Sequence, residues 1–189
     1  QGLDEYWIAI GGIFSAMEPL PLALMVIEAW KNYREKRAAG GEVNQFTTPF
    51  MWITGSVILN FIGAGVFGMI INTPTISYYS HGTYLIMPHA HTALLGAFGY
   101  VSIAFLYMTS RANSLANGYI WNDKLSKISF WSLTIGVLLF SFPTMMIGLE
   151  QTKAAAEMGY YFTRTREALV EMDTWMWFRV LPDAMMIGG

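Results

Sequence analysis

The sequence of 189 residues contains no cysteine and little charge. Without cysteine the chain can form no disulfide, no iron–sulfur cluster and no cysteine-bound zinc site, so histidine and carboxylate side chains are the metal ligands that remain. Only 13% of the residues are charged, whereas 54% are hydrophobic. This composition is too apolar for an ordinary soluble domain and indicates a membrane protein.

Basic residues are also scarce, which argues against a nucleic-acid-binding protein. Eleven lysines and arginines stand against 13 acidic residues, and they form no groove-binding motif, so we expect no nucleic-acid partner.

The sequence begins at Gln1 without the charged start of a signal peptide, and it ends inside an apolar run. We therefore expect a fragment of a longer polypeptide, with sites that residues outside the fragment complete.

Four apolar runs are long enough to cross a bilayer: residues 6–30, 50–71, 82–109 and 128–149. Each could form a helix of about 33 Å or more, against a hydrocarbon core of about 30 Å. A fifth run starts around Trp175. The sequence predicts an all-α fold, a polytopic transmembrane helix bundle with four complete spanning helices and the start of a fifth. Residues 1–189 are expected to form a single membrane domain.

The distribution of basic residues predicts an orientation. Seven lie in the loops after the first and third runs, and three lie in residues 150–174. The positive-inside rule places the first and third loops in the cytoplasm, and the N-terminus and His81 on the outer side. Residues 150–174 are polar and predict a surface or interfacial helix. Aromatic residues at the ends of runs are typical of an interfacial belt: Tyr6, Trp30, Trp52, Tyr107 and Trp131.

Three histidines lie in the stretch HGTYLIMPHAHTALLGAFG, residues 81–99. Residues two apart on an α-helix differ by about 200°, so His89 and His91 project from nearly opposite faces and cannot share one metal ion. Each could be an axial ligand of its own flat cofactor, or could hydrogen-bond to a neighbouring helix. Counted from residue 82, His89 lies about 10 Å into its helix. His81, at the outer mouth, is either a solvated loop residue or a contact for a propionate or an ion.

Glu18 is a second anomaly, because it lies well inside the first apolar run, which offers no basic partner near it. A carboxylate at this depth is costly, so we expect it to be protonated or to lie beside a metal or a water chain. Pro19 and Pro21 remove backbone donors and predict a bend. The glycines of GAGVFG, residues 63–68, predict close helix packing, to which Asn60 can add a hydrogen bond.

Three stretches of the sequence resemble the catalytic subunit of the haem–copper oxidase superfamily, and within it the quinol-dependent nitric oxide reductases. SYYSHGTYLIMPHAHTALLGAFG is similar to the tenth transmembrane helix of that family, IGGIFSAMEPLPL to the eighth, and FRVLPDAMMIGG to the start of the twelfth. The stretches occur in the family's order and cover essentially the whole chain. The resemblance implies a fragment of a catalytic subunit with about twelve helices.

The resemblance also implies a role for each candidate residue. His89 would be the axial ligand of a high-spin haem at the reaction centre, and His91 an axial ligand of the low-spin haem that supplies its electrons. Glu18 matches a catalytic glutamate near the non-haem iron, which stabilises that metal or passes protons. The implied cofactors are two haems, one low-spin and one high-spin, and a non-haem iron whose histidine ligands lie before Gln1.

The implied reaction joins two molecules of nitric oxide into nitrous oxide and water, with quinol as electron donor, in the lipid bilayer of a bacterial cytoplasmic membrane during denitrification. Positioning is then the main catalytic device, and the haem iron supplies the redox chemistry. Pro88 replaces the small or polar residue expected before His89, which leaves open a nitric oxide dismutase that forms N₂ and O₂. Further alternatives are a haem–copper oxygen reductase and, outside enzymes, a membrane transporter or structural subunit.

Overall fold

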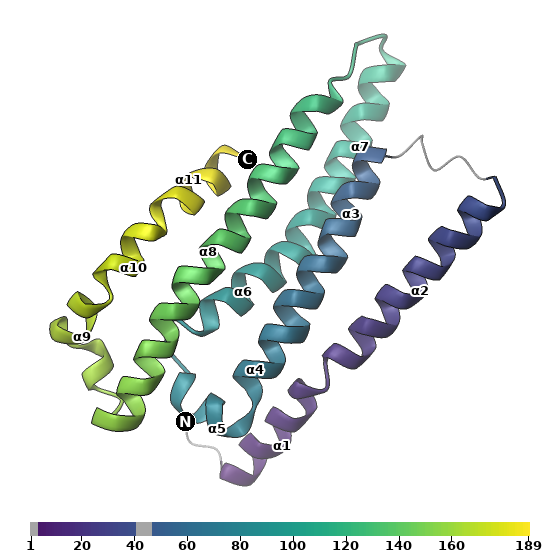
Figure 1. Ribbon diagram of the computed structural model, residues 1–189. Coiled ribbons are helices and arrows are strands. Elements are labelled where there is room, and N and C mark those ends of the chain that lie inside the picture. The colour runs from purple at the N-terminus through teal and green to yellow at the C-terminus, as the bar shows by residue number, and fades with distance from the viewer. Residues whose placement is uncertain (1–3, 41–46) are drawn as a thin grey trace.

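A computed structural model describes residues 4–40 and 47–189 of the chain. These residues form helices and no strand. Four helical spans are long and apolar enough to cross a membrane, and they run alternately up and down (Figure 1). The spans are Glu5–Ala38, Thr48–Asn72, Ile86–Ala116 and Asp123–Met158. The predicted fold class, an all-α bundle of transmembrane helices, is confirmed.

The first span is broken at Glu18. Helix α1 (Glu5–Ala16) ends two residues earlier, and α2 (Pro19–Ala38) starts with a proline as its first residue. Proline suits this position because its fixed φ is helical and the missing N–H would have no acceptor inside the helix. The bend predicted from the prolines is present as a break between α1 and α2 (Figure 1).

The second and third spans each contain a π-helical segment. The second consists of α3 (Thr47–Asn60), η2 (Phe61–Phe67) and α4 (Gly68–Asn72). The third consists of α6 (Ile86–Leu94), η3 (Leu95–Tyr100) and α7 (Val101–Ala116). Segment η2 packs against α6, and η3 packs against α3. Segments of π-helix are rare in proteins, and those that occur are often found at functional sites.

Glycines bring these two spans into backbone contact. A Cβ added at Gly63 would lie 2.6 Å from the backbone carbon of Thr92, and one added at Gly96 would lie 2.7 Å from the backbone nitrogen of Asn60. Ser56 Oγ donates across the same contact to the carbonyl of Gly96 at 2.5 Å. The close packing predicted from the glycines is confirmed at Gly63, and the hydrogen bond from Asn60 stays a prediction.

The third span begins later than the sequence predicts. Helix α5 (Pro74–Ser80) is followed by turns over residues 81–85, where Gly82 has a φ of 82°, and α6 begins only at Ile86. His89 therefore lies in the first turn of its helix, and its predicted depth in the helix is wrong. Pro88 lies in the same first turn, where backbone N–H groups have no acceptor inside the helix, so the proline is tolerated.

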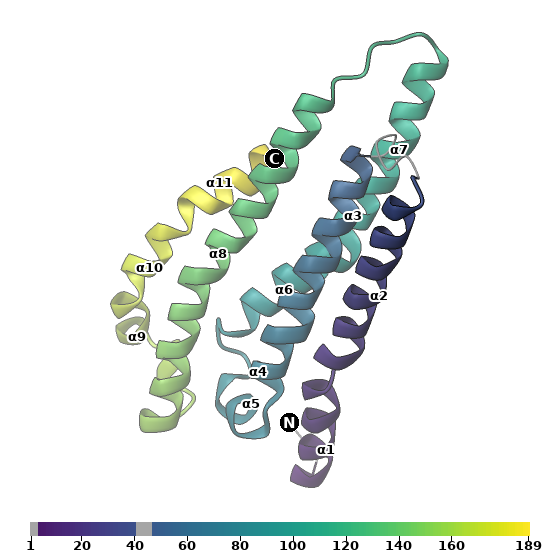
Figure 2. The ribbon, with the colours of Figure 1, turned by 45° about the vertical axis from the view of Figure 1, so that its right-hand side comes forward.

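The fourth span is longer than its apolar run. Helix α8 (Asp123–Met158) continues through Pro143 and through the helix-forming segment EQTKAAAEM, and it ends before Gly159, whose φ is 88°. The prediction of one separate surface helix at 150–174 is therefore wrong. The chain turns through η4 (Phe162–Arg164) and α9 (Arg166–Glu171), and α10 (Asp173–Phe178) and α11 (Val180–Gly188) return along α8 (Figures 1 and 2).

The core lies between α3, η3, α7 and α8. Trp52 is 1% exposed, and its ring centre lies 5.0 Å from that of Tyr100 and 5.2 Å from that of Phe130. Tyr107 is also buried, whereas Tyr6, Trp30 and Trp131 are exposed. The belt prediction is therefore wrong for Trp52 and Tyr107, because both rings turn inward to polar partners on neighbouring helices.

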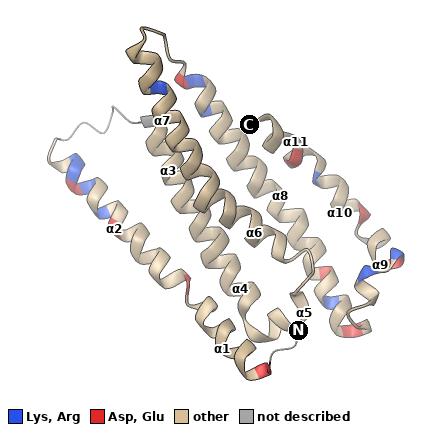
Figure 3. Ribbon diagram, turned by 180° about the vertical axis from the view of Figure 1, so that it is seen from behind, with Lys and Arg blue, Asp and Glu red and all other residues tan. Residues whose placement is uncertain are grey.

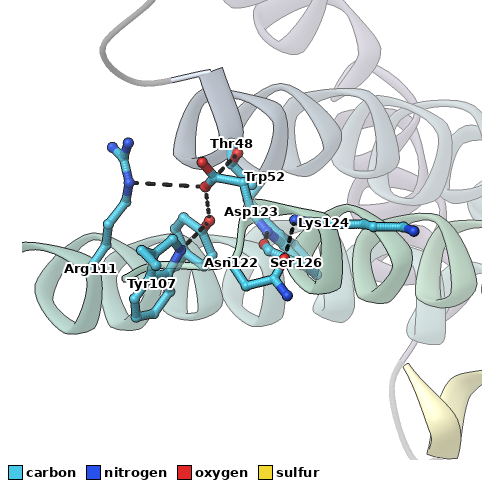
Figure 4. A network of polar contacts seen from close by, with 9 residues as sticks. Thr48, Trp52, Tyr107, Arg111, Asn122, Asp123, Lys124 and Ser126 are labelled. Carbon is cyan, nitrogen blue, oxygen red and sulfur yellow. Dashed lines mark hydrogen bonds and ion pairs between the residues drawn. The ribbon is translucent and has the colours of Figure 1, made fainter. Parts of the chain in front are cut away.

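A polar network joins α3, α7 and α8 at one end of the bundle (Figure 4). The Asp123 carboxylate accepts hydrogen bonds from Thr48 Oγ1, at 3.3 Å, and from the Tyr107 hydroxyl, and it lies 3.9 Å from Arg111 Nε. Trp121 Nε1 donates to the Tyr107 hydroxyl at 2.7 Å. The basic residues of the first and third loops lie at this same end (Figure 3), as the alternation of spans predicts.

Candidate functional site

His89 and His91 contact different helices from the same turn of α6. His89 Nδ1 lies 2.8 Å from the carbonyl oxygen of Gly63 in η2. The His91 ring centre lies 4.7 Å from that of Phe140 in α8. Helix α6 packs against both η2 and α8. The two imidazoles thus lie on separate sides of α6, in agreement with their spacing of two residues.

Both histidines use Nδ1 for a hydrogen bond to a backbone carbonyl. Gly63 provides the acceptor for His89, and Met87, four residues earlier in the same helix, provides it for His91 at 3.0 Å. A carbonyl can only accept, so Nδ1 carries the proton in each ring. In the neutral form of each ring, the lone pair is then on Nε2. This is the hydrogen-bonding arrangement that orients histidines as metal ligands.

Glu18 lies on the His89 side of α6. A Cβ added at Gly68, the first residue of α4, would lie 3.4 Å from Glu18 Oε2 and 3.3 Å from His89 Cε1. The break between α1 and α2 places Glu18 at this position, and the missing side chain of Gly68 leaves room between the two groups. The structure therefore brings together Glu18 and His89, which are 71 positions apart in the sequence.

His81 occupies a separate position, in the turns that precede α6. Its side chain is exposed, and its backbone carbonyl accepts a hydrogen bond from the hydroxyl of Tyr160. The structure thus gives a contact for the His81 backbone. The contact of its imidazole with a propionate or an ion stays a prediction.

Arg179 is a site residue that sequence reasoning missed. Its guanidinium carbon lies 4.9 Å from the ring centre of Phe140, the residue that contacts His91. Arg179 Nη2 also lies 3.7 Å from Asp183 Oδ2, and Arg179 Nε is buried and has no hydrogen-bond partner among the described residues. The signal was a single arginine inside the apolar run WMWFRVLPDAMMIGG. A cation here can hold an anionic group next to His91.

Within residues 4–40 and 47–189, no three histidine, aspartate or glutamate side chains group to hold a metal ion. The candidate ligands are instead single imidazoles. A haem needs only one or two ligands from the protein, because the porphyrin supplies the in-plane ligands of its iron. The donor set therefore fits haem better than a metal ion bound by protein side chains alone.

The fold and the site together define an integral membrane protein in which one helix carries two single histidines on different sides. Residues 1–185 match the family described as cytochrome c and quinol oxidase polypeptide I. The chain belongs to this family, and the resemblance to haem–copper oxidase catalytic subunits is confirmed. Members of this family are membrane-bound oxidoreductases that bind haems and metal.

Curated relatives include both nitric oxide reductases and oxidases. The chain is 29% identical over 154 residues to a nitric oxide reductase subunit of Stutzerimonas stutzeri, which covers 79% of this chain and 31% of that protein. It is 29% identical over 106 residues to quinol oxidase subunit 1 of Bacillus subtilis, covering 56% of this chain and 16% of that protein. It is 28% identical over 111 residues to cytochrome c oxidase subunit 1 of Cereibacter sphaeroides, covering 58% of this chain and 18% of that protein. The chain therefore spans less than a third of each of these relatives.

Proposed function

We propose that the chain is part of a membrane nitric oxide reductase that reduces nitric oxide to nitrous oxide. His89 is the axial ligand of a high-spin haem, and His91 is an axial ligand of a low-spin haem. The observation that carries this proposal is that both histidines engage Nδ1 with a carbonyl, one toward η2 and one beside α8. Each Nε2 is then available for its own iron.

The same hydrogen bonds weigh against a transporter or structural subunit in which the histidines only join helices. His89 does bond to another helix, through Gly63. His91 bonds within its own helix, to Met87, so an interhelical hydrogen bond does not explain why a polar ring occupies this position. Ligation of a metal through Nε2 accounts for both residues.

The length of the match favours nitric oxide over oxygen as the substrate. Similarity to the nitric oxide reductase subunit extends over 79% of the chain, whereas similarity to the two oxidases extends over 56% and 58%. Pro88 does not oppose this choice, because it lies in the first turn of α6 and His89 keeps its bond to Gly63.

Each residue of the site has a defined task in this proposal. When bound, the haems supply electron transfer and a site for nitric oxide, and residues outside the chain complete the non-haem iron. Glu18 holds or moves a proton at Oε2 on the His89 side. Arg179 holds an anionic group, such as a haem carboxylate, on the His91 side. Gly63 allows the backbone of η2 to pack on α6, and Gly68 leaves room between Glu18 and His89.

We further propose that the protein lies in a bacterial cytoplasmic membrane, surrounded by lipid, with quinol as its electron donor. The C-terminal part of α2, with Lys31 and Arg34, and the first turns of α8, with Lys124 and Lys127, then face the cytoplasm, and the turn at His81 faces outward. In this orientation, His89 and His91 lie in the part of α6 that is nearer the outer surface.

The test uses the full-length parent protein, purified without oxygen and supplied with nitric oxide and a reduced soluble quinol. The proposal predicts one molecule of nitrous oxide for every two of nitric oxide, with two electrons and two protons taken from one quinol. Formation of N₂ and O₂ without quinol would identify a dismutase instead. A purified protein without haem absorption would overturn the proposal for either enzyme.

A further inference from the structure

The turns that precede α6 are fixed by a buried side chain of α8. Gln151 is 6% exposed, and its Oε1 accepts a hydrogen bond from the backbone nitrogen of Tyr84 at 2.8 Å. A Cβ added at Gly148, one turn earlier in α8, would lie 2.7 Å from Leu85 Cβ. Helix α8 therefore packs directly on residues 84–85 and provides a hydrogen-bond acceptor there.

Backbone donors in this segment need such acceptors. N–H groups at the start of a helix have no carbonyl one turn earlier to bind. Thr83 Oγ1 accepts from the backbone nitrogen of Leu85 at 3.3 Å, and Gln151 Oε1 accepts from that of Tyr84. The local sequence thus provides one acceptor, whereas the other comes from a residue 67 positions away. Gln151 sets where α6 starts relative to α8.

A continuous series of hydrogen bonds leads from Gln151 to His91. Gln151 Oε1 accepts from Tyr84 N, the carbonyl of Tyr84 accepts from Met87 N at 3.0 Å, and the carbonyl of Met87 accepts from His91 Nδ1 at 3.0 Å. Helix α8 also carries Phe140, beside the His91 ring. One helix therefore fixes both the hydrogen-bond partner and the packing of this imidazole.

His89 is fixed by a different element. Its Nδ1 partner is the carbonyl of Gly63 in η2, which is not part of the series that starts at Gln151. A change at Gln151 that moves residues 84–87 therefore displaces the acceptor of His91 and leaves the acceptor of His89 in place.

We infer that Gln151 is a positioning residue for His91, holding the acceptor of its Nδ1 and so the direction of its Nε2. The inference rests on the proposed function, because it requires His91 to bind the low-spin haem. Hydrogen bonding at Nδ1 tunes an imidazole ligand, and loss of such outer partners weakens metal sites. Gln151 therefore acts on the low-spin haem and not on the high-spin haem.

The experiment compares variants of the full-length parent protein that contains its haems. Gln151→Leu removes the acceptor, and Gln151→Glu keeps an oxygen at the same position. Thr152→Val is the control, because Thr152 Oγ1 donates within α8, to the carbonyl of Gly148 at 2.7 Å. Visible and electron paramagnetic resonance spectra and a redox titration follow each haem. We expect Gln151→Leu to shift the low-spin signal and its midpoint potential while carbon monoxide binding at the high-spin haem keeps its wild-type rate.

Gln151→Glu and Thr152→Val should retain the wild-type low-spin signal. Unchanged haems in Gln151→Leu, or equal changes in both haems, would overturn the inference and leave the proposed function standing. A wild-type protein without haem would overturn the proposed function itself. If Gln151→Leu does not accumulate, Tyr160→Phe tests the same turn by removing the bond to the His81 carbonyl, and it should shift the low-spin signal in the same direction by a smaller amount.

Discussion

The two sides of α6 differ in the groups that surround each histidine. On the His89 side the neighbours are glycines and one carboxylate, and the hydrogen-bond partner comes from another helix. On the His91 side the neighbours are the ring of Phe140 and, beyond it, the cation of Arg179, and the hydrogen-bond partner comes from α6 itself. A reaction centre needs room for substrates and a proton source, whereas a haem that only passes electrons can be enclosed by side chains.

The difference also concerns rigidity. Gly63 fixes His89 through backbone contact between two spans, where a change of one atom forces the backbone to move. His91 bonds to a carbonyl of its own helix and packs on the side chain of Phe140, which can adjust. We therefore expect substitutions on the His89 side to have larger effects than equally conservative substitutions on the His91 side.

The largest effect is expected from Gly63→Ala. Its Cβ would lie 2.6 Å from the Thr92 carbon, so the two spans must separate, and the high-spin haem site should be lost together with most of the assembled protein. Overpacking of this kind costs about 1–3 kcal/mol or more. The control is Gly65→Ala, whose Cβ would find its nearest neighbour at 3.6 Å. Haem content and thermal stability are measured for both variants. Equal losses in Gly63→Ala and Gly65→Ala would refute the special role of Gly63.

Glu18→Gln should give the next largest effect. Loss of the proton-transferring group is expected to slow nitric oxide turnover by about 10²–10⁴-fold, with the low-spin spectrum unchanged. The matched control is Glu28→Gln, ten residues further along the same span, in α2; both glutamates are at exposed positions of this chain. Steady-state turnover with quinol distinguishes them, and wild-type turnover in Glu18→Gln would show that this carboxylate transfers no proton.

Gly68→Ala should have a moderate effect on the same side. The added Cβ would lie 3.3 Å from His89 Cε1 and 3.4 Å from Glu18 Oε2, so each group must shift by only a few tenths of an ångström. Because a misplacement of about 1 Å can cost about 10²-fold in rate, we expect a loss of up to about tenfold. The variant should alter carbon monoxide rebinding at the high-spin haem. A changed low-spin spectrum with normal rebinding would contradict the separation of the two sides.

Phe140→Leu should have the smallest effect. It removes the ring between His91 and Arg179, at a cost of about 1 kcal/mol for the lost cation–π contact and a similar amount for repacking. We expect a small shift of the low-spin absorption band and unchanged turnover. The control is Phe105→Leu, at a position of α7 that is 63% exposed. A turnover loss as large as that of Gly68→Ala would show that the His91 side is no more tolerant than the His89 side.

Features of the fold that depend on local properties were predictable from the sequence. The four spans follow from the lengths of the apolar runs, the break at Glu18 follows from Pro19, and the separation of His89 and His91 follows from the rotation of a helix. Each of these depends on residues that are neighbours in the chain.

Features that depend on contacts between distant residues were not predictable. At the start of α6, the backbone nitrogen of Tyr84 donates to Gln151 of α8, a partner 67 positions away that no local pattern indicates. Trp52 is buried against Tyr100 and Phe130, and its indole nitrogen donates to Ser126 of α8 at 3.0 Å. The proximity of Glu18 to His89 required the position of Gly68, which only the packed spans supply.

The central claim is that His89 and His91 each bind the iron of a separate haem. The most direct test is the visible and electron paramagnetic resonance spectrum of the full-length parent protein carrying His89→Ala or His91→Ala. We predict that His91→Ala loses the low-spin signal and keeps the high-spin one, and that His89→Ala does the reverse. Loss of the same signal in both variants, or of neither signal in either, would contradict the claim.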